Sequence, residues 1–216
     1  MQGSPPASPL PPLGNTVSLR SSAGVIPVVL IELWAGVGVL SLSFRQQGIP
    51  LVAFLERETL FSAFLSHPTL HPAAQGAGLF EDRLWEQWQL PPNAVVIVAG
   101  GPSCTSIAAP GKRLAGRDPS SSHLAETLEV AAFCKADFVL LENVPNLVLE
   151  DRSHGLFSAL KTQARDLSYW LADPLFLRDS GLGVSPNVKG SFSSSSPRLQ
   201  LSCCQYGLAQ AGHLTM

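Results

Sequence analysis

The sequence predicts an α/β protein built on a doubly wound, mostly parallel sheet. Apolar runs of strand length recur along the chain, and segments with helical periodicity follow several of them. Strands that alternate with helices at this spacing form βαβ units, whose strands run parallel. The apolar runs span residues 27–33, 51–55, 94–99 and 137–141, and the helical segments span 39–47, 58–66 and about 122–135.

The first apolar run, Pro27–Leu33, has the near-continuous hydrophobicity of a strand that is buried on both faces. It ends in a turn rich in small residues, Trp34–Gly38. The segment Val39–Gln47 then has one apolar face, which predicts an amphipathic helix, and Gly48 ends it. The second run ends directly before Glu56.

Weaker patterns fill the rest of the chain. A short strand is predicted near 78–81, a helical segment over 82–88, and one or two strands within 169–190, such as 169–177. The first 25 residues are rich in proline, serine and glycine, and a run of serines begins at Ser191; both patterns are typical of disorder. The predicted organisation is therefore a disordered tail (1–25), one core domain (26–190) and a disordered or poorly packed tail (191–216).

Composition narrows the class of protein. The net charge is −2, whereas a nucleic-acid binder usually presents a basic face, so the whole chain is not expected to grip DNA strongly by itself. The four cysteines form no CxxC pair, and neither they nor the five histidines have metal-ligand spacing, so no metal site is expected. No apolar run reaches the roughly 18 residues of a membrane helix, and no secretory signal is visible. An intracellular protein without a membrane anchor is the interpretation.

Four segments that could carry chemistry fall where predicted strands end. They are Trp34–Gly38, Glu56, Gly101–Cys104 and Glu142–Asn143. Because ligands of parallel sheets bind beyond the carboxyl ends of the strands, we expect these segments to form a site.

The first two segments are typical of a cofactor site. A turn with Gly36 and Gly38 lets a ligand approach the backbone closely, although such short glycine patterns also occur in ordinary turns. The fuller dinucleotide pattern GxGxxG is broken by Ser41, which argues against NAD. Glu56 could accept hydrogen bonds from ribose hydroxyls or could be a solvated acid at a strand end.

The last two segments are typical of nucleophilic catalysis. Cys104 follows a buried strand in a loop opened by two glycines, with Lys112 and Arg113 nearby in sequence, and thiolate chemistry needs such an electropositive place. The alternative is an inert apolar cysteine, as expected for Cys134 within its helix. Glu142 ends an apolar strand, where partial desolvation would raise its pKa; a surface acid is the alternative.

Together these motifs resemble the cytosine-C5 DNA methyltransferase family over about residues 27–150. Residues 31–38 resemble the family's Asp-Leu-Phe-Ala-Gly-x-Gly-Gly motif. The loop 100–104 resembles its Gly-Gly-Pro-Pro-Cys-Gln nucleophile loop, and residues 142–144 match its Glu-Asn-Val motif. The order and spacing of the three motifs agree with the family. The resemblance implies a Rossmann-like fold of the kind that binds S-adenosylmethionine.

The resemblance also implies residue roles. Cys104 would attack C6 of a flipped-out cytosine, Glu142 would hydrogen-bond or protonate N3, and Asn143 would order the site. The resemblance further implies which residues bind S-adenosylmethionine. Glu56 would hold its ribose, and Asp82 would contact its adenine amino group. The residues that would line the cofactor are Trp34, Gly36, Gly38 and Ser103. The implied partner is DNA, or RNA as for the family's tRNA-modifying members, and a nuclear location would follow in a eukaryote.

Departures from the family pattern leave three hypotheses open. In the first motif, Glu32 replaces the usual aspartate and Val39 replaces a glycine. In the nucleophile loop, Ser103 replaces a proline and Thr105 replaces a glutamine. Ser120 replaces the arginine of the family's Asp-Pro-Arg, and residues 183–189 keep only a trace of its Gln-x-Arg-x-Arg motif. Cations that would neutralise DNA phosphates are therefore missing. The chain is either an active methyltransferase, a catalytically silent or truncated remnant that binds cofactor or a partner, or a generic nucleotide-binding domain.

Overall fold

A computed structural model of the 216-residue chain describes residues 17–21, 24–72, 74–102, 122–148, 153, 155–177 and 206–213. The chain divides into two units, Met1–Val95 and Val96–Met216. In the described part, every helix is too short or too polar to traverse a lipid bilayer.

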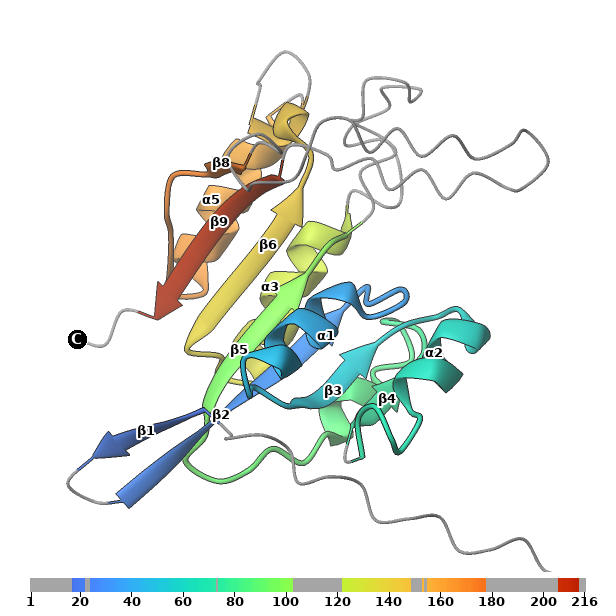
Figure 1. Ribbon diagram of the computed structural model, residues 1–216. Helices are drawn as coiled ribbons and strands as arrows, with labels where there is room; N and C mark the ends of the chain where they lie inside the picture. Colours follow the sequence, from blue (N-terminus) through green and yellow to red (C-terminus); the bar gives the residue numbers. More distant parts are fainter. Residues whose placement is uncertain are drawn as a thin grey trace, which may run out of the picture. The chain divides into compact units, whose positions relative to one another are not determined.

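The first unit is built on parallel strands in the order β4-β3-β2 (Figure 1). Strand β2 spans Gly24–Leu33, β3 spans Leu51–Leu55 and β4 spans Gln75–Ala77. The short strand β1, Ser18–Ser21, pairs antiparallel with the start of β2 as a hairpin. All of β3 and the second half of β2 are buried, so both strands have the two-sided burial that their continuous apolar sequences predict.

Three short helices complete the first unit. Helix α1, Val39–Gln46, packs on β2 and β3; α2 spans Thr59–Leu65; and the 3-10 helix η1, Leu84–Gln87, packs beside β4. Trp85 of η1 is fully buried, and its indole N–H donates a hydrogen bond to the carbonyl oxygen of Phe80 at 3.0 Å. These contacts fix the segments that follow the carboxyl ends of the strands.

The second unit combines one parallel and several antiparallel pairs. Strands β5 (Val95–Gly100) and β6 (Phe138–Asn143) run parallel. Strand β9 (Tyr206–His213) then pairs antiparallel with β6, with β7 (Tyr169–Leu171) and with β8 (Leu175–Leu177).

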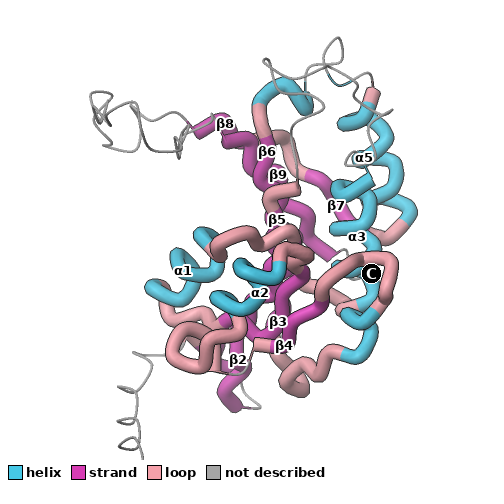
Figure 2. The backbone as a smooth tube through the Cα atoms, turned by 90° about the vertical axis from the view of Figure 1, so that its right-hand side faces the viewer, coloured by secondary structure: helices cyan, strands magenta, loops and turns pink. Residues whose placement is uncertain are grey.

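Helices α3, His123–Phe133, and α5, Leu156–Asp166, contact each other and cover one face of this second group of strands (Figure 2). A 3-10 helix, η4 (Pro145–Val148), connects β6 to this layer and contacts α5. The covered face buries alternate residues of the strands, including Val139 and Leu141.

The α/β class with a mostly parallel sheet, predicted from the sequence, is confirmed. The boundaries of α1, β3, β5 and β6 agree with the predicted ones to within two residues. The strand expected near 78–81 is instead β4 at Gln75–Ala77. Its sequence has no β-forming residue, and it forms because it pairs with β3 and because Gly76 lets the Phe54 ring pack against its backbone.

Three further elements differ from the sequence prediction. Residues 18–21 and 24–25 were expected in a disordered tail but lie in the paired strands β1 and β2, and residues 206–213 of the other predicted tail form β9. In both cases strand pairing, which composition does not encode, orders the segment. Helix α5 was not predicted, although Phe157, Leu160 and Ala164 lie on one buried face at helical spacing.

Tyr169 provides a test of the packing in the second unit. Its hydroxyl is buried and lies 3.1 Å from the carbonyl oxygen of Ala131 and 3.0 Å from that of Ala136. Tyr169→Phe removes the shared donor, so we expect the free energy of unfolding to fall by about 1–2 kcal/mol in urea denaturation. The neighbouring Trp170→Phe is the control, because that side chain is 61% exposed. Equal losses in the two variants would contradict this interpretation.

Candidate functional site

Each unit brings together part of the predicted site. In the first unit, the turn after β2 contacts Glu56 at the end of β3. In the second unit, Gly101 and Pro102 after β5 contact Glu142 and Asn143 at the end of β6. The predicted nucleophile Cys104, Ser103 and the family departures at 105, 120 and 183–189 lie outside the described residues.

The turn Trp34–Gly38 has an unusual backbone. Trp34, Gly36 and Gly38 have φ angles of 57°, 53° and 75°, all in the left-handed region. Glycine adopts this region freely, but a bulky residue such as Trp34 does so at a cost of about 1–3 kcal/mol. Such strain persists only where surrounding contacts enforce it, which marks the turn as a candidate functional segment.

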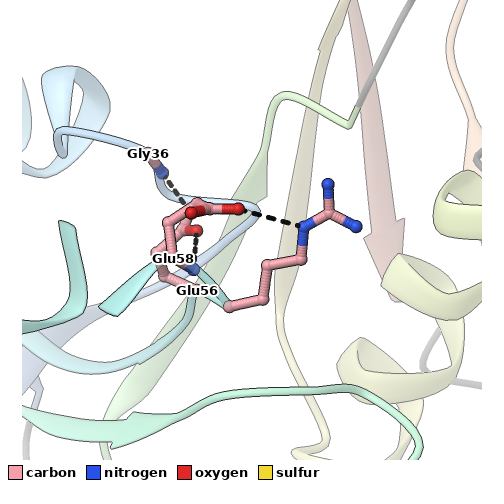
Figure 3. A network of polar contacts seen from close by, with 4 residues as sticks. Gly36, Glu56 and Glu58 are labelled. Atoms are coloured by element: carbon pink, nitrogen blue, oxygen red, sulfur yellow. Dashed lines mark hydrogen bonds and ion pairs between the residues drawn. The ribbon is translucent and has the colours of Figure 1, made fainter. Parts of the chain in front are cut away.

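Glu56 supplies one of these enforcing contacts (Figure 3). Its side chain is only 7% exposed. One carboxylate oxygen accepts the backbone N–H of Gly36 at 2.6 Å, and the other accepts the backbone N–H of Glu58 at 2.7 Å. A carboxylate has about four acceptor positions, so lone pairs remain that could receive hydroxyl groups of a ligand.

The space in front of the turn differs between its two glycines. A Cβ built on Gly36 would meet no atom within 4 Å, whereas one on Gly38 would lie 2.5 Å from Cδ2 of Leu65 in α2. Gly38 is therefore needed for packing inside the unit, and Gly36 faces open space. A turn that has open space in front of Gly36 and a carboxylate beside it fits a ribose-bearing cofactor.

Glu32 also belongs to the site in the first unit, and sequence reasoning noted it only as a departure from the family motif. It is 2% exposed, and its carboxylate accepts the backbone N–H of Ser41 at 3.0 Å. Burial is the main cause that raises the pKa of Glu32 from 4.5 to about 7. Hydrogen bonds from Ser41 and Leu40 lower this pKa, and the charge of the nearby Glu56 raises it further.

Asp82 is exposed in the turn that precedes η1. The adjacent Arg83 pairs with Glu86 and lies over the Trp85 ring, 5.0 Å from its centre. No contact described for Asp82 joins it to the Trp34–Gly38 turn, so its role at the adenine amino group stays a prediction.

In the second unit, Asn143 holds the loop after β5. This residue is 3% exposed; its side-chain amide donates a hydrogen bond to the carbonyl oxygen of Pro102 at 3.1 Å, and its Oδ1 accepts the N–H of Val144 at 2.9 Å. Both polar ends of the amide are therefore used, and the Gly-Gly-Pro segment is tied to the end of β6.

Glu142 lies over Gly101. A Cβ built on Gly101 would be 3.0 Å from Oε2 of Glu142, so a glycine leaves the room that the carboxyl group occupies. Burial raises the pKa of Glu142, as expected from its position at the end of an apolar strand. A carboxyl group with a raised pKa can hold a proton closer to neutral pH and donate it.

Other nucleophiles and metal ligands do not compete with this site in the described residues. Burial raises the pKa of Cys134 to about 12, so its thiol stays protonated, as expected for an inert cysteine. Over the same part of the chain, His, Cys, Asp and Glu side chains form no cluster of three that could hold a metal ion.

Comparison with known proteins identifies a family. The family model described as C-5 cytosine-specific DNA methylase matches residues 28–172. Among curated protein sequences, none matches the chain.

Solved structures share the fold. A prophage-encoded E. coli chain described as a DNA modification methyltransferase aligns with a TM-score of 0.56 and 16% identity, over 86% of this chain and 47% of that one. A mutant of Spodoptera frugiperda DNMT2 aligns with a TM-score of 0.53 and 17% identity, over 86% and 50% of the two chains. The S. pombe Dnmt2 methyltransferase aligns with 0.51 and 15%, over 88% and 52%. The present chain thus has a methyltransferase-like α/β fold and spans about half the length of these structures.

The two turn glycines give a matched pair of variants. Both alanine variants force a left-handed alanine, at about 1–2 kcal/mol. Gly38→Ala adds a clash with Leu65 and with Oγ of Ser41, 2.8 Å from the new Cβ. We therefore expect Gly38→Ala to lower the free energy of unfolding by about 1–3 kcal/mol more than Gly36→Ala in urea denaturation. Equal losses would show that Gly38 is not packed as described.

Glu32→Gln tests the burial of Glu32. The pKa of Glu32 is about 7 in the folded chain, above the ordinary value of 4.5. The contribution of the Glu32 carboxyl group to the free energy of unfolding is therefore complete below pH 4.5 and is lost as the pH rises through 7. Relative to the variant, the native chain should lose up to about 3 kcal/mol of unfolding free energy between pH 4.5 and 8. The measurement is urea denaturation across this range, and a difference that stays constant with pH would contradict the expectation.

Proposed function

This chain belongs to the C-5 cytosine-specific DNA methylase family, and from that premise we propose that it transfers a methyl group from S-adenosylmethionine to C5 of cytosine in DNA, through a covalent bond to Cys104. The observation that carries the proposal is the placement of Glu142. Its carboxyl group lies over Gly101, in the loop that leads to Cys104, and burial raises its pKa.

The turn of the first unit supports cofactor binding. When bound, S-adenosylmethionine supplies an electrophilic methyl group on a sulfonium. Glu56 would hold the ribose hydroxyls with the lone pairs that Gly36 and Glu58 leave free. Trp34, Gly36 and Gly38 would line the cofactor along the left-handed turn, with Ser103 beside it and Asp82 at its adenine amino group.

Glu142 and Asn143 support the chemistry on the base. A Glu142 that holds a proton can donate it to N3 of a flipped-out cytosine, which makes C6 more electrophilic. Asn143 acts on the loop, because its amide fixes the Pro102 carbonyl two residues before Cys104. The positions of acid and nucleophile would thus depend on one hydrogen-bonded segment.

The bond changes balance without another reactant. The Cys104 thiolate forms a bond to C6, and the electron pair of the C5–C6 double bond makes C5 nucleophilic. C5 takes the methyl group as the bond from methyl to sulfur breaks. Loss of the C5 proton to a base then restores the double bond and expels Cys104 as a thiolate, and N3 returns its proton to Glu142.

The departures from the family pattern favour a second candidate, a chain that binds the cofactor without turnover. The chain has a net charge of −2 and a serine at position 120, where the family has an arginine. It therefore lacks cations that would neutralise DNA phosphates. On this candidate Glu56 and the turn keep their roles, and Cys104 has none.

Trapping separates the two candidates. With S-adenosylmethionine present, a duplex that contains 5-fluorocytosine should form a covalent adduct with the native chain, because fluorine cannot leave C5 as a proton does. Cys104→Ser should form none, and Cys134→Ser is the matched control that should still form it. Adducts are counted by denaturing gel and mass spectrometry.

A parallel arm uses a 5-fluorocytosine tRNA. Adduct on the tRNA alone would reassign the substrate to RNA. No adduct on either substrate, in a chain that binds the cofactor, would favour the silent candidate, and an adduct that survives Cys104→Ser would refute the nucleophile.

A further inference from the structure

Helix α1 begins without a cap of its own. The residue before its first turn is Gly38, which offers no side chain, and the first turn contains no acidic residue. The first backbone N–H groups of a helix have no partner within it, and a side-chain acceptor normally satisfies them. For α1 these groups point toward the end of strand β2.

Glu32 supplies the acceptor from β2. Its carboxylate accepts the N–H of Ser41 at 3.0 Å and interacts with the N–H of Leu40, so two donors of the first turn end on one side chain nine residues earlier in sequence. Ser41 also donates its hydroxyl to the carbonyl oxygen of Gly38 at 2.9 Å. The start of the helix and the end of the turn are therefore joined through Ser41.

A local cap cannot replace this arrangement. Gly38 has φ of +75°, and a Cβ there would lie 2.5 Å from Leu65. A serine or aspartate at this position, the usual capping residue, would clash and strain the backbone. The acceptor must therefore come from elsewhere in the fold.

Two carboxylates thus hold the turn and the helix that follows it. Strands β2 and β3 are paired in parallel, with Glu32 beside Phe54, so Glu32 and Glu56 leave neighbouring strand ends. Glu56 accepts the N–H of Gly36 in the middle of the turn, and Glu32 accepts that of Ser41 in the first turn of α1.

We propose that Glu32 is a positioning residue for the cofactor turn: by capping helix α1 from strand β2, its carboxylate sets the backbone of Trp34–Gly38 that would receive S-adenosylmethionine. The identity of this ligand rests on the function proposed above. The cap itself is a property of the ligand-free chain.

The electrostatic surroundings make the cap observable. Among the described residues, the charged group that acts on Glu32 is Glu56 from the end of β3, and α1 presents Leu40 and Ser41 to it. Burial raises the pKa of Glu32 to about 7. The amides of Leu40 and Ser41 should therefore report the Glu32 charge in a pH range where exposed carboxylates are already ionised.

Amide NMR of the ligand-free chain tests the cap. The nitrogen and proton shifts of Leu40 and Ser41 should titrate with a midpoint near pH 7, and Glu32→Gln should abolish that titration. Glu56→Gln should keep it with a lower midpoint, because the repulsion that raises the pKa of Glu32 is gone. Glu58→Gln, at an exposed acid that accepts no hydrogen bond from the turn, is the matched control and should leave the midpoint in place. A titration of Ser41 that persists in Glu32→Gln would overturn the proposal.

Binding then tests the consequence for the turn. Glu32→Ala should weaken binding of both S-adenosylmethionine and S-adenosylhomocysteine at least tenfold in calorimetry at pH 7.5, and Glu32→Gln, which keeps an acceptor oxygen, should weaken it less than threefold. Similar losses for the charged and the uncharged ligand are required, because the effect acts through the turn. Native-like binding by a folded Glu32→Ala chain, or a loss confined to S-adenosylmethionine, would overturn the positioning role. A native chain that binds neither ligand would refute the proposed function. The positioning role of Glu32 would then be decided by the Ser41 titration and by hydrogen exchange of the Gly36 amide. That amide should be protected in the native chain and should lose its protection in Glu32→Ala.

Discussion

The hydrogen bond between the Gly36 amide and the Glu56 carboxylate joins the two strand ends from which the first unit builds its site. Gly36 is left-handed, as are Trp34 and Gly38, and such a backbone persists only when outside contacts enforce it. Glu56 supplies one contact in the middle of the turn, and Leu65 packs against Gly38 at its end. The turn is thus held by contacts within its own unit, while Gly36 faces open space.

The second unit uses the same device with an amide in place of a carboxylate. The side-chain amide of Asn143 donates to the carbonyl oxygen of Pro102 and accepts the N–H of Val144. It therefore joins the loop after β5 to the end of β6. Glu142 is then left with its carboxyl group over Gly101, half-buried and with a raised pKa. In both units a polar residue at one strand end fixes the loop that follows a neighbouring strand.

Periodicity predicted several elements that form through local sequence, although helix α5 was missed, and it failed where strand pairing decides. Helix α1 and strand β3 follow from amphipathic and continuous apolar patterns. Strand β4 has the sequence Gln-Gly-Ala and exists because it lies beside β3, and β9 lies in a tail whose composition suggests disorder. Among site residues, Glu56 was predictable because a carboxylate ends a buried strand. The capping role of Glu32 was not, because it depends on which helix amides a strand residue faces after folding.

The central claim, that the first unit binds a ribose-bearing cofactor beside the turn and Glu56, is tested most directly by calorimetry with S-adenosylhomocysteine. The native chain should bind it, Glu56→Ala should lose at least tenfold in affinity, and Glu58→Ala should bind as the native chain does. The last variant removes an exposed side chain but keeps the backbone N–H that Glu56 accepts. No binding by the native chain at millimolar ligand, or equal affinity in a folded Glu56→Ala chain, would contradict the claim.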